Sequence, residues 1–211
     1  MSGDPALLVS LQSIALAAGL AWASGIRLYV VLLLIGAGGY FGWIALPPHL
    51  EVLANPIVLG TSATLAVAEF FADKIPGFDS LWDAIHTFIR IPAGALLAAG
   101  SVGGLGPDSL PLMVAAGLIG GTITAGSHFT KAGTRVAINH SPEPFSNWAA
   151  SLFEDFAAPG IVWLALVAPV LLLIGLLFAI LVALWLLPKL WRWIATILRR
   201  IAGWGSPPLP L

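Results

Sequence analysis

Charged side chains crowd a short stretch of a chain that is otherwise strongly apolar. Asp79, Asp83, His86 and Arg90 follow one another at intervals of four, three and four residues. This spacing places them along one face of an α-helix. Charges near lipid are costly and persist where they have partners, water or a function. The pattern therefore predicts a polar site inside a membrane protein.

Other polar residues could complete this site from distant parts of the sequence. The carboxylates and His86 could bind or relay an ion or solute, while Arg27, Arg90 and Arg135 could balance charge or hold an anionic group. The full candidate set is Arg27, Glu69, Asp73, Asp79, Asp83, His86, Arg90, Arg135, Asn139, Asn147, Glu154 and Asp155.

Two chemistries compete for these side chains. Asp79, Asp83 and His86 are candidate ligands for a divalent cation, which binds carboxylate oxygen and imidazole nitrogen. No His-Glu-x-x-His or EF-hand pattern supports that choice, and the sequence indicates no other cofactor. The alternative is a set of structural ion pairs, in which nearby bases neutralise the acids. The bases available for this are Arg27, Lys74, Arg90, Lys131 and Arg135.

No residue can be assigned a catalytic role from the sequence. A hydrolase needs a nucleophile and a base, and serines and histidines are present, but no Gly-x-Ser-x-Gly elbow occurs.

Composition determines the class of protein. The 211 residues are 59% hydrophobic and 9% charged, with a mean hydropathy of +0.97, so the chain has too little polar surface for a soluble globule. The net charge of −1 argues against a nucleic-acid partner. The absence of cysteine excludes disulfides and thiolate metal sites.

The N-terminal apolar stretch is preceded by Asp4 and by no basic residue, whereas a signal peptide begins with basic residues. We therefore expect this stretch to be retained rather than cleaved.

Six apolar runs are candidates to cross the lipid bilayer, namely 6–23, 28–46, 56–72, 85–100, 111–129 and 160–187. The first two are separated only by residues 24–27, which demands a tight hairpin or a broken helix. We predict an all-α fold, a polytopic transmembrane helical bundle of about six spans. One transmembrane domain would occupy 1–188, followed over 189–211 by a basic amphipathic interfacial helix and a Pro-rich tail. Formation of a homo-oligomer is left open.

The charge pattern predicts an orientation. Four of the nine basic residues follow the last apolar run, so the C-terminal end is expected to be cytoplasmic. On a six-span count, residues 73–83 would then face the opposite side. The four basic residues are Lys189, Arg192, Arg199 and Arg200.

Two parts of the chain resemble each other. Gly25-Ile26-Arg27 matches Gly133-Thr134-Arg135, and Pro92 follows Phe78 by 14 residues, as Pro159 follows Phe145. We predict two short, Pro-terminated amphipathic helices, 78–92 and 145–159, that are re-entrant, interfacial or crossing. The repeat is parallel if 78–92 crosses and inverted if it re-enters. Paired interrupted segments are typical of transporter binding sites, and we expect these two to meet and enclose the site with Arg27 and Arg135.

The most specific part of the chain is the stretch Asp73-Lys74-Ile75-Pro76-Gly77-Phe78-Asp79-Ser80-Leu81-Trp82-Asp83. With residues 68–69, 86–90, 131–135, 146–147 and 154–155, it resembles domain of unknown function 4126, over about residues 10–185. That family is a set of small bacterial integral membrane proteins. The resemblance implies a multi-pass protein of the bacterial inner membrane, and it brings no established activity.

The function that these features favour is transport, as a transporter or channel that passes a small ion or solute through a polar intramembrane site. One alternative is a membrane-embedded enzyme that acts on a lipid headgroup. Another is a structural or partner-binding membrane subunit.

Overall fold

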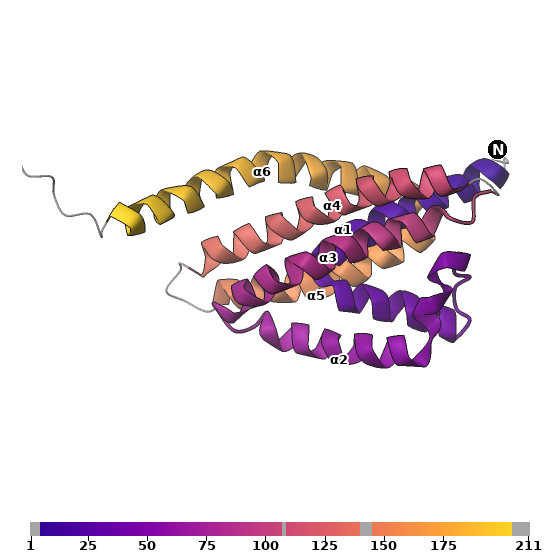
Figure 1. Ribbon diagram of the computed structural model, residues 1–211, viewed down its shortest axis with the longest axis horizontal. Helices are drawn as coiled ribbons and strands as arrows, with labels where there is room; N and C mark the ends of the chain where they lie inside the picture. The colour runs from indigo at the N-terminus through magenta and orange to yellow at the C-terminus, as the bar shows by residue number, and fades with distance from the viewer. Residues whose placement is uncertain (1–4, 107–108, 140–144, 204–211) are drawn as a thin grey trace, which may run out of the picture.

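The computed structural model describes residues 5–106, 109–139 and 145–203, and within these ranges the chain is helical with no strand. This confirms the predicted all-α class. Figure 1 shows an elongated bundle in which most helices run along its length. The elements are α1 (Pro5–Tyr40), the 3₁₀ helix η1 (Pro48–Ala54), α2 (Pro56–Ala72), α3 (Phe78–Val102), α4 (Leu110–Ile138), α5 (Phe145–Val167) and α6 (Pro169–Gly203).

Helix α1 is broken at Arg27 and folds back on itself. Arg27 has non-helical angles, with φ −143° and ψ 77°. Gln12, before the break, lines the same surface hollow as Leu46, which lies after it. In one straight helix these two residues would be roughly 50 Å apart, at 1.5 Å per residue. The first two predicted runs are therefore the two arms of a tight hairpin, with Arg27 at its tip (Figure 1).

Five helices are long and apolar enough to cross a membrane, namely α1, α3, α4, α5 and α6. The pair η1 and α2, bent by 69°, makes a sixth candidate. Because the two arms of α1 run in opposite directions, the described residues contain seven segments along the bundle, one more than the six predicted runs. Helix α2 begins as its sequence predicts, because Asn55 caps it by accepting from the Ile57 amide at 2.9 Å.

The two Pro-terminated segments do not end at their prolines. Helix α3 continues through Pro92 to Val102, and α5 continues through Pro159 to Val167. Both segments therefore lie within helices of crossing length. An internal proline removes one backbone hydrogen bond, which membrane helices tolerate when neighbouring groups compensate.

The predicted last run, 160–187, is divided between two helices. α5 ends at Val167 and α6 begins at Pro169, because a proline lacks the N–H needed to continue the preceding helix and fits best at a helix start. Helix α6 then runs through Pro188 to Gly203, so no break in the helix marks the expected boundary at 188. The expected Pro-rich tail includes residues 204–211, which lie outside the described residues.

Helix α5 is one more crossing than the sequence predicted, and it changes which parts of the chain lie on the same side of the membrane. Asn139, at the end of α4, donates to Asp79 at 2.8 Å, and Trp148 on α5 donates to the Lys74 carbonyl. Ser80 on α3 and Ile194 on α6 line one hollow. The connector 73–77 and the C-terminal part of α6 therefore share one end of the bundle, here called the polar end (Figure 1). The expectation that they face opposite sides is wrong, since α5 adds one crossing.

The two matching parts of the chain run in the same direction. The first arm of α1 and all of α4 run toward the polar end and carry the Gly-x-Arg motifs, whereas α3 and α5 run away from it (Figure 1). This is the parallel arrangement expected if 78–92 crosses. Glycine is required in the first motif, since a Cβ on Gly25 would lie 2.6 Å from the Thr124 carbonyl oxygen on α4.

Apolar side chains form both the core and the outer surface. Leu20, Leu28 and Ile35 of α1 pack with Leu97 of α3 in the buried core. The outside is also apolar, with exposed Phe88, Leu118, Phe153 and Phe178 on four different helices. A helical bundle that is apolar on the outside is suited to lipid rather than water. The chain is therefore a multi-pass membrane protein whose polar groups face inward.

We expect the polar end to be on one side of the membrane and η1 on the other. Single cysteines replacing Ile75 and Thr196, both exposed, should react with an impermeant maleimide from the same side of sealed vesicles. A cysteine replacing the exposed Val52 should react from the other side only. Labelling of positions 75 and 196 from opposite sides would contradict this arrangement.

Candidate functional site

Eleven charged side chains form one connected group near the polar end, here called the charged cluster. Five helices and the connector after α2 contribute to it. Most members are completely buried, whereas Lys74 and Asp155 are 29% and 16% exposed. The members are Arg27, Glu69, Asp73, Lys74, Asp79, Asp83, Arg90, Lys131, Arg135, Glu154 and Asp155.

Arg27, at the tip of the α1 hairpin, connects α2 with α5. Its guanidinium nitrogens lie 3.0 Å from an Asp73 oxygen and 2.5 Å from an Asp155 oxygen. It also donates to the Glu69 carbonyl at 3.2 Å and to the Ser151 hydroxyl at 3.2 Å. Several donors in a fixed plane let one arginine hold groups from two helices at once.

Asp73 lies at the centre of the cluster. Its Oδ2 atom accepts from Lys131 Nζ at 2.7 Å as well as from Arg27. Lys131 also donates to the Ile26 carbonyl at 3.0 Å, next to the break in α1. Burial raises the pKa of Asp73, but Lys131 and Arg27, together with Arg135, outweigh that effect and hold the pKa below its usual value.

Arg135, in the second Gly-x-Arg motif, binds α5. It makes a two-point contact with Glu154, from Nη2 at 2.7 Å and Nε at 3.2 Å. Its Nη1 donates to both the side-chain and main-chain oxygens of Asn147 and lies 3.9 Å from Asp79. Arginine forks of this kind are among the strongest hydrogen-bonded pairs in proteins.

Arg90 forms the deepest part of the cluster. It binds Glu69 at 2.5 Å and Asp83 at 2.7 Å, and its Nη1 lies 3.3 Å from Nδ1 of His128. An arginine can only donate, so Nδ1 accepts and the proton of a neutral His128 is on Nε2. Nε2 then donates to the Thr87 hydroxyl at 2.7 Å, and that hydroxyl donates to the Asp83 carbonyl.

His86 is separate from this network. Its ring stacks on Trp82, with centroids 4.1 Å apart, and meets Tyr29 edge-on. Nδ1 lies 2.8 Å from the Trp82 carbonyl, so it carries a proton.

The two acids predicted to bind a metal together with His86 have other partners. Asp83 pairs with Arg90, and Asp79 accepts from Asn139. Within the described ranges no three His, Asp or Glu side chains gather as a metal site, so the predicted ligand trio is not brought together.

The two amphipathic segments contribute to one site without packing on each other. Basic side chains of α1 and α4 lie between them: Lys131 is 3.4 Å from Asp83 on α3 and 3.4 Å from Glu154 on α5. α3 and α5 make no substantial helix contact among the described residues. The expectation that they meet is therefore wrong, because opposite charges draw both helices to the bases rather than to each other.

The cluster contains six acids and five bases, so its formal charge is −1 when all are ionised. Among the described residues, four carboxylates each have one buried oxygen with no hydrogen-bond partner. These atoms are Oε2 of Glu69, Oδ1 of Asp73, Oδ2 of Asp79 and Oδ2 of Asp83. Buried unpaired acceptors are costly, so this is where the cluster could take up a proton or cation.

All candidate site residues except His86 belong to the charged cluster or bind it directly. The candidate site set did not include Lys131, which joins three acids and was named only as a neutralising base, or His128 and Ser151. Lys131 could have been predicted from spacing, because it lies four residues before Arg135 and therefore shares a helix face with it. Ser151 could have been predicted in the same way, because it lies four residues after Asn147 and three before Glu154. The role of His128 could not be predicted from spacing, since it depends on Arg90 of another helix.

A family model with the description domain of unknown function (DUF4126) matches residues 14–189. No curated protein matches the chain, and no solved structure does. The functional argument therefore rests on the geometry of the charged cluster.

Arg90→Met should destabilise the protein strongly, by about 3–5 kcal/mol, because it leaves Glu69 and Asp83 buried without their shared cation. Adding Glu69→Gln should restore part of that loss, a coupling that a double-mutant cycle measures. Unfolding in detergent would report both. Lys74→Met is the control and should cost only about 0–1 kcal/mol, since Lys74 is partly exposed. Equal losses from Arg90→Met and Lys74→Met would contradict the cluster's energetic role.

Stability should fall in acid through Asp73. Its pKa in the folded state is lowered, so its contribution is present above the unfolded pKa, near 4, and disappears as the pH falls through the folded value. Melting temperatures in detergent should therefore drop below about pH 4. Asp73→Asn should lower stability at neutral pH and make the acid-side slope shallower, whereas Glu51→Gln, exposed on η1, should leave the slope unchanged. A slope that Asp73→Asn does not alter would contradict this assignment.

Proposed function

We propose that this chain, which belongs to the domain of unknown function 4126 family, moves a proton or small monovalent cation across the membrane through the charged cluster. The observation that carries the proposal is the excess of one carboxylate over the bases inside a buried group. Intramembrane ionisable residues mark ion pathways and proton relays. One bound proton or cation would neutralise the cluster.

The members of the charged cluster form a continuous chain of ion pairs that leads from the partly exposed side chains into the interior. Ion pairs run from the partly exposed Lys74 and Asp155 through Arg27 and Asp73 to the fully buried Arg90. An ion entering at the polar end meets carboxylates at successive depths. Each transfer exchanges one partner for another, which limits the cost of holding charge in a low-dielectric interior.

The broken helix supports transport as well. Binding sites of many transporters are formed by discontinuous helices near the middle of the membrane, where unwound backbone meets the ion. The tip of α1 supplies such a break, with the Ile26 carbonyl turned toward Lys131. Beyond the tip, apolar Leu28, Ile35 and Leu97 fill the core, so the cluster is closed from the other end and transport requires the two arms of α1 to move.

The structure disfavours the lipid-headgroup enzyme as the alternative. Among the described residues, the Thr87 hydroxyl lies in contact with the His128 imidazole. Arg90 occupies Nδ1, so Nε2 carries a proton and cannot accept one from Thr87. A purely structural or partner-binding subunit remains the second reading, in which the cluster only holds the helices together.

The distribution of basic residues over the two ends of the bundle indicates how the protein is oriented in the membrane. Lys189, Arg192 and Arg199 of α6 lie toward the polar end, as do the bases of the cluster. An excess of basic residues marks the cytoplasmic side. We therefore place the polar end, with the C-terminal part of α6, in the cytoplasm, and on the family resemblance we place the protein in the bacterial inner membrane.

Proteoliposomes test the transport proposal. With a pH-sensitive dye inside and a potential applied, wild-type protein should carry protons, or potassium or sodium with matching indicators. Asp83→Asn should abolish that flux, because it removes the excess charge beside Arg90 and Lys131. Glu51→Gln on η1, outside the cluster, is the matched control and should retain full flux. Wild-type rates equal to protein-free liposomes, together with a loss of thermal stability in Asp83→Asn, would favour the structural reading.

A further inference from the structure

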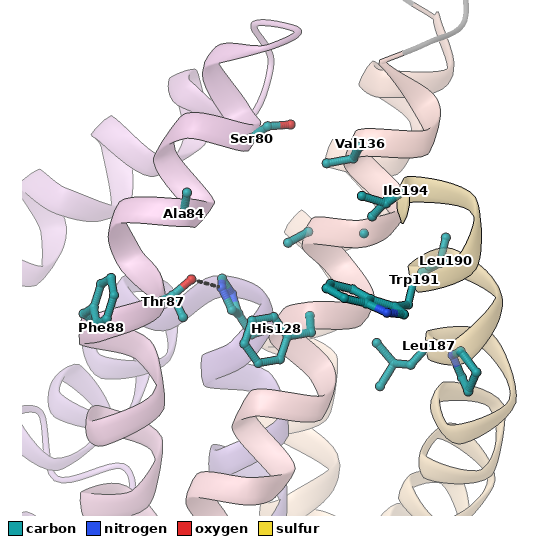
Figure 2. Close-up of a pocket in the computed structure, with 14 residues that line it drawn as sticks. Ser80, Ala84, Thr87, Phe88, His128, Val136, Leu187, Leu190, Trp191 and Ile194 are labelled. Carbon is teal, nitrogen blue, oxygen red and sulfur yellow. Dashed lines mark hydrogen bonds between the residues drawn. The ribbon is translucent and has the colours of Figure 1, made fainter. Parts of the chain in front are cut away.

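A large apolar groove lies beside the charged cluster and has no part in the proposed transport. It has a volume of about 760 Å³ and lies between α3, α4 and α6. Figure 2 shows Ala84 on one side and Trp191 and Leu187 on α6 on the other, with His128 between them. We call it the α6 groove.

The few polar groups of the α6 groove are already bonded within the protein. Thr87 and His128 bind each other, as the dashed line in Figure 2 shows, and Thr87 donates onward to the Asp83 carbonyl. The remaining walls are almost wholly apolar, with Ala132, Val136 and Leu187 among them. The groove therefore offers dispersion contacts and an escape from water, and little to direct a polar ligand.

The surroundings of the groove indicate lipid. Phe88 and Trp191, which line it, are 84% and 70% exposed on the outer, lipid-suited surface of the bundle. The groove is thus continuous with the surface that faces acyl chains. A hollow of this kind in a bilayer would be filled by a hydrocarbon chain, since leaving apolar walls unfilled forfeits their contacts.

Charge at the same level indicates which lipid. The part of α6 that lines the groove, 187–194, also carries the exposed bases Lys189 and Arg192, with Trp185 and Trp193 nearby. Tryptophan and basic side chains together mark the boundary between acyl chains and headgroups. Helix α6 contains no acidic residue, so α6 itself offers only positive charge to a headgroup at this level.

We propose that the α6 groove holds one acyl chain of an anionic phospholipid, with the headgroup beside Lys189 and Arg192. The basic residues attract the negative headgroup, and the apolar walls bind the chain. This site is separate from ion movement, so a protein that carries no ion could still bind the lipid, and the reverse.

Native mass spectrometry of the purified full-length chain would test the proposal with dioleoyl-phosphatidylglycerol and dioleoyl-phosphatidylcholine as probes. The wild type should retain one phosphatidylglycerol, with roughly 30-fold preference over phosphatidylcholine if both bases contribute. Lys189→Gln/Arg192→Gln should remove that preference while leaving the weaker, chain-driven binding. Ala132→Trp and Ala84→Phe, which place bulk in the groove from α4 and α3, should lose binding of both lipids.

Leu177→Trp is the matched control, because Leu177 is exposed on α6 and outside the groove. It should bind lipid as the wild type does. Unchanged lipid binding in Ala132→Trp and Ala84→Phe, with melting temperatures that show both are folded, would overturn the acyl-chain site. Equal binding of the two lipids by the wild type would overturn the anionic headgroup, and a lipid-free dimer would show that a second copy of the chain covers the groove instead.

Discussion

The ion pairs that Asp73 makes with Arg27 and Lys131 are the interaction on which the rest of the structure depends. The three side chains come from the end of α2, the tip of α1 and the C-terminal third of α4. None can be buried alone, because an uncompensated charge in a low-dielectric interior costs several kcal/mol. Their mutual neutralisation requires three distant segments to meet at one point, and so positions the helices around them.

The same requirement explains the hairpin in α1. A continuous helix would carry Arg27 past the acids, whereas a break there lets the guanidinium reach Asp73 and Asp155 and turns the Ile26 carbonyl toward Lys131. The second arm then returns to the apolar core beside Leu97. Among the described residues the buried charges gather near one end and the core beyond them is apolar, which is suited to a site that opens toward one side of the membrane.

His128 contacts the charged cluster on one side and lines the α6 groove on the other. One ring nitrogen accepts from Arg90 in the charged cluster, and the other donates to Thr87 at the wall of the α6 groove. A lipid in the groove would therefore be separated from the cluster by a single side chain.

The sequence by itself determined the class of protein, the apolar runs that form helices and most of the side chains of the charged cluster. Apolar runs long enough to cross a bilayer define helices wherever they occur, and the spacing of Asp79, Asp83 and Arg90 determines that they share a face. Only the tertiary structure decided which way the chain turns at Arg27, that the helices continue through Pro92 and Pro159, and that they break at Ala168. It also placed Asp83 on Arg90 and Asp79 on Asn139, apart from His86. These outcomes depend on which distant charge is near enough to offset desolvation, and spacing along the chain does not contain that information.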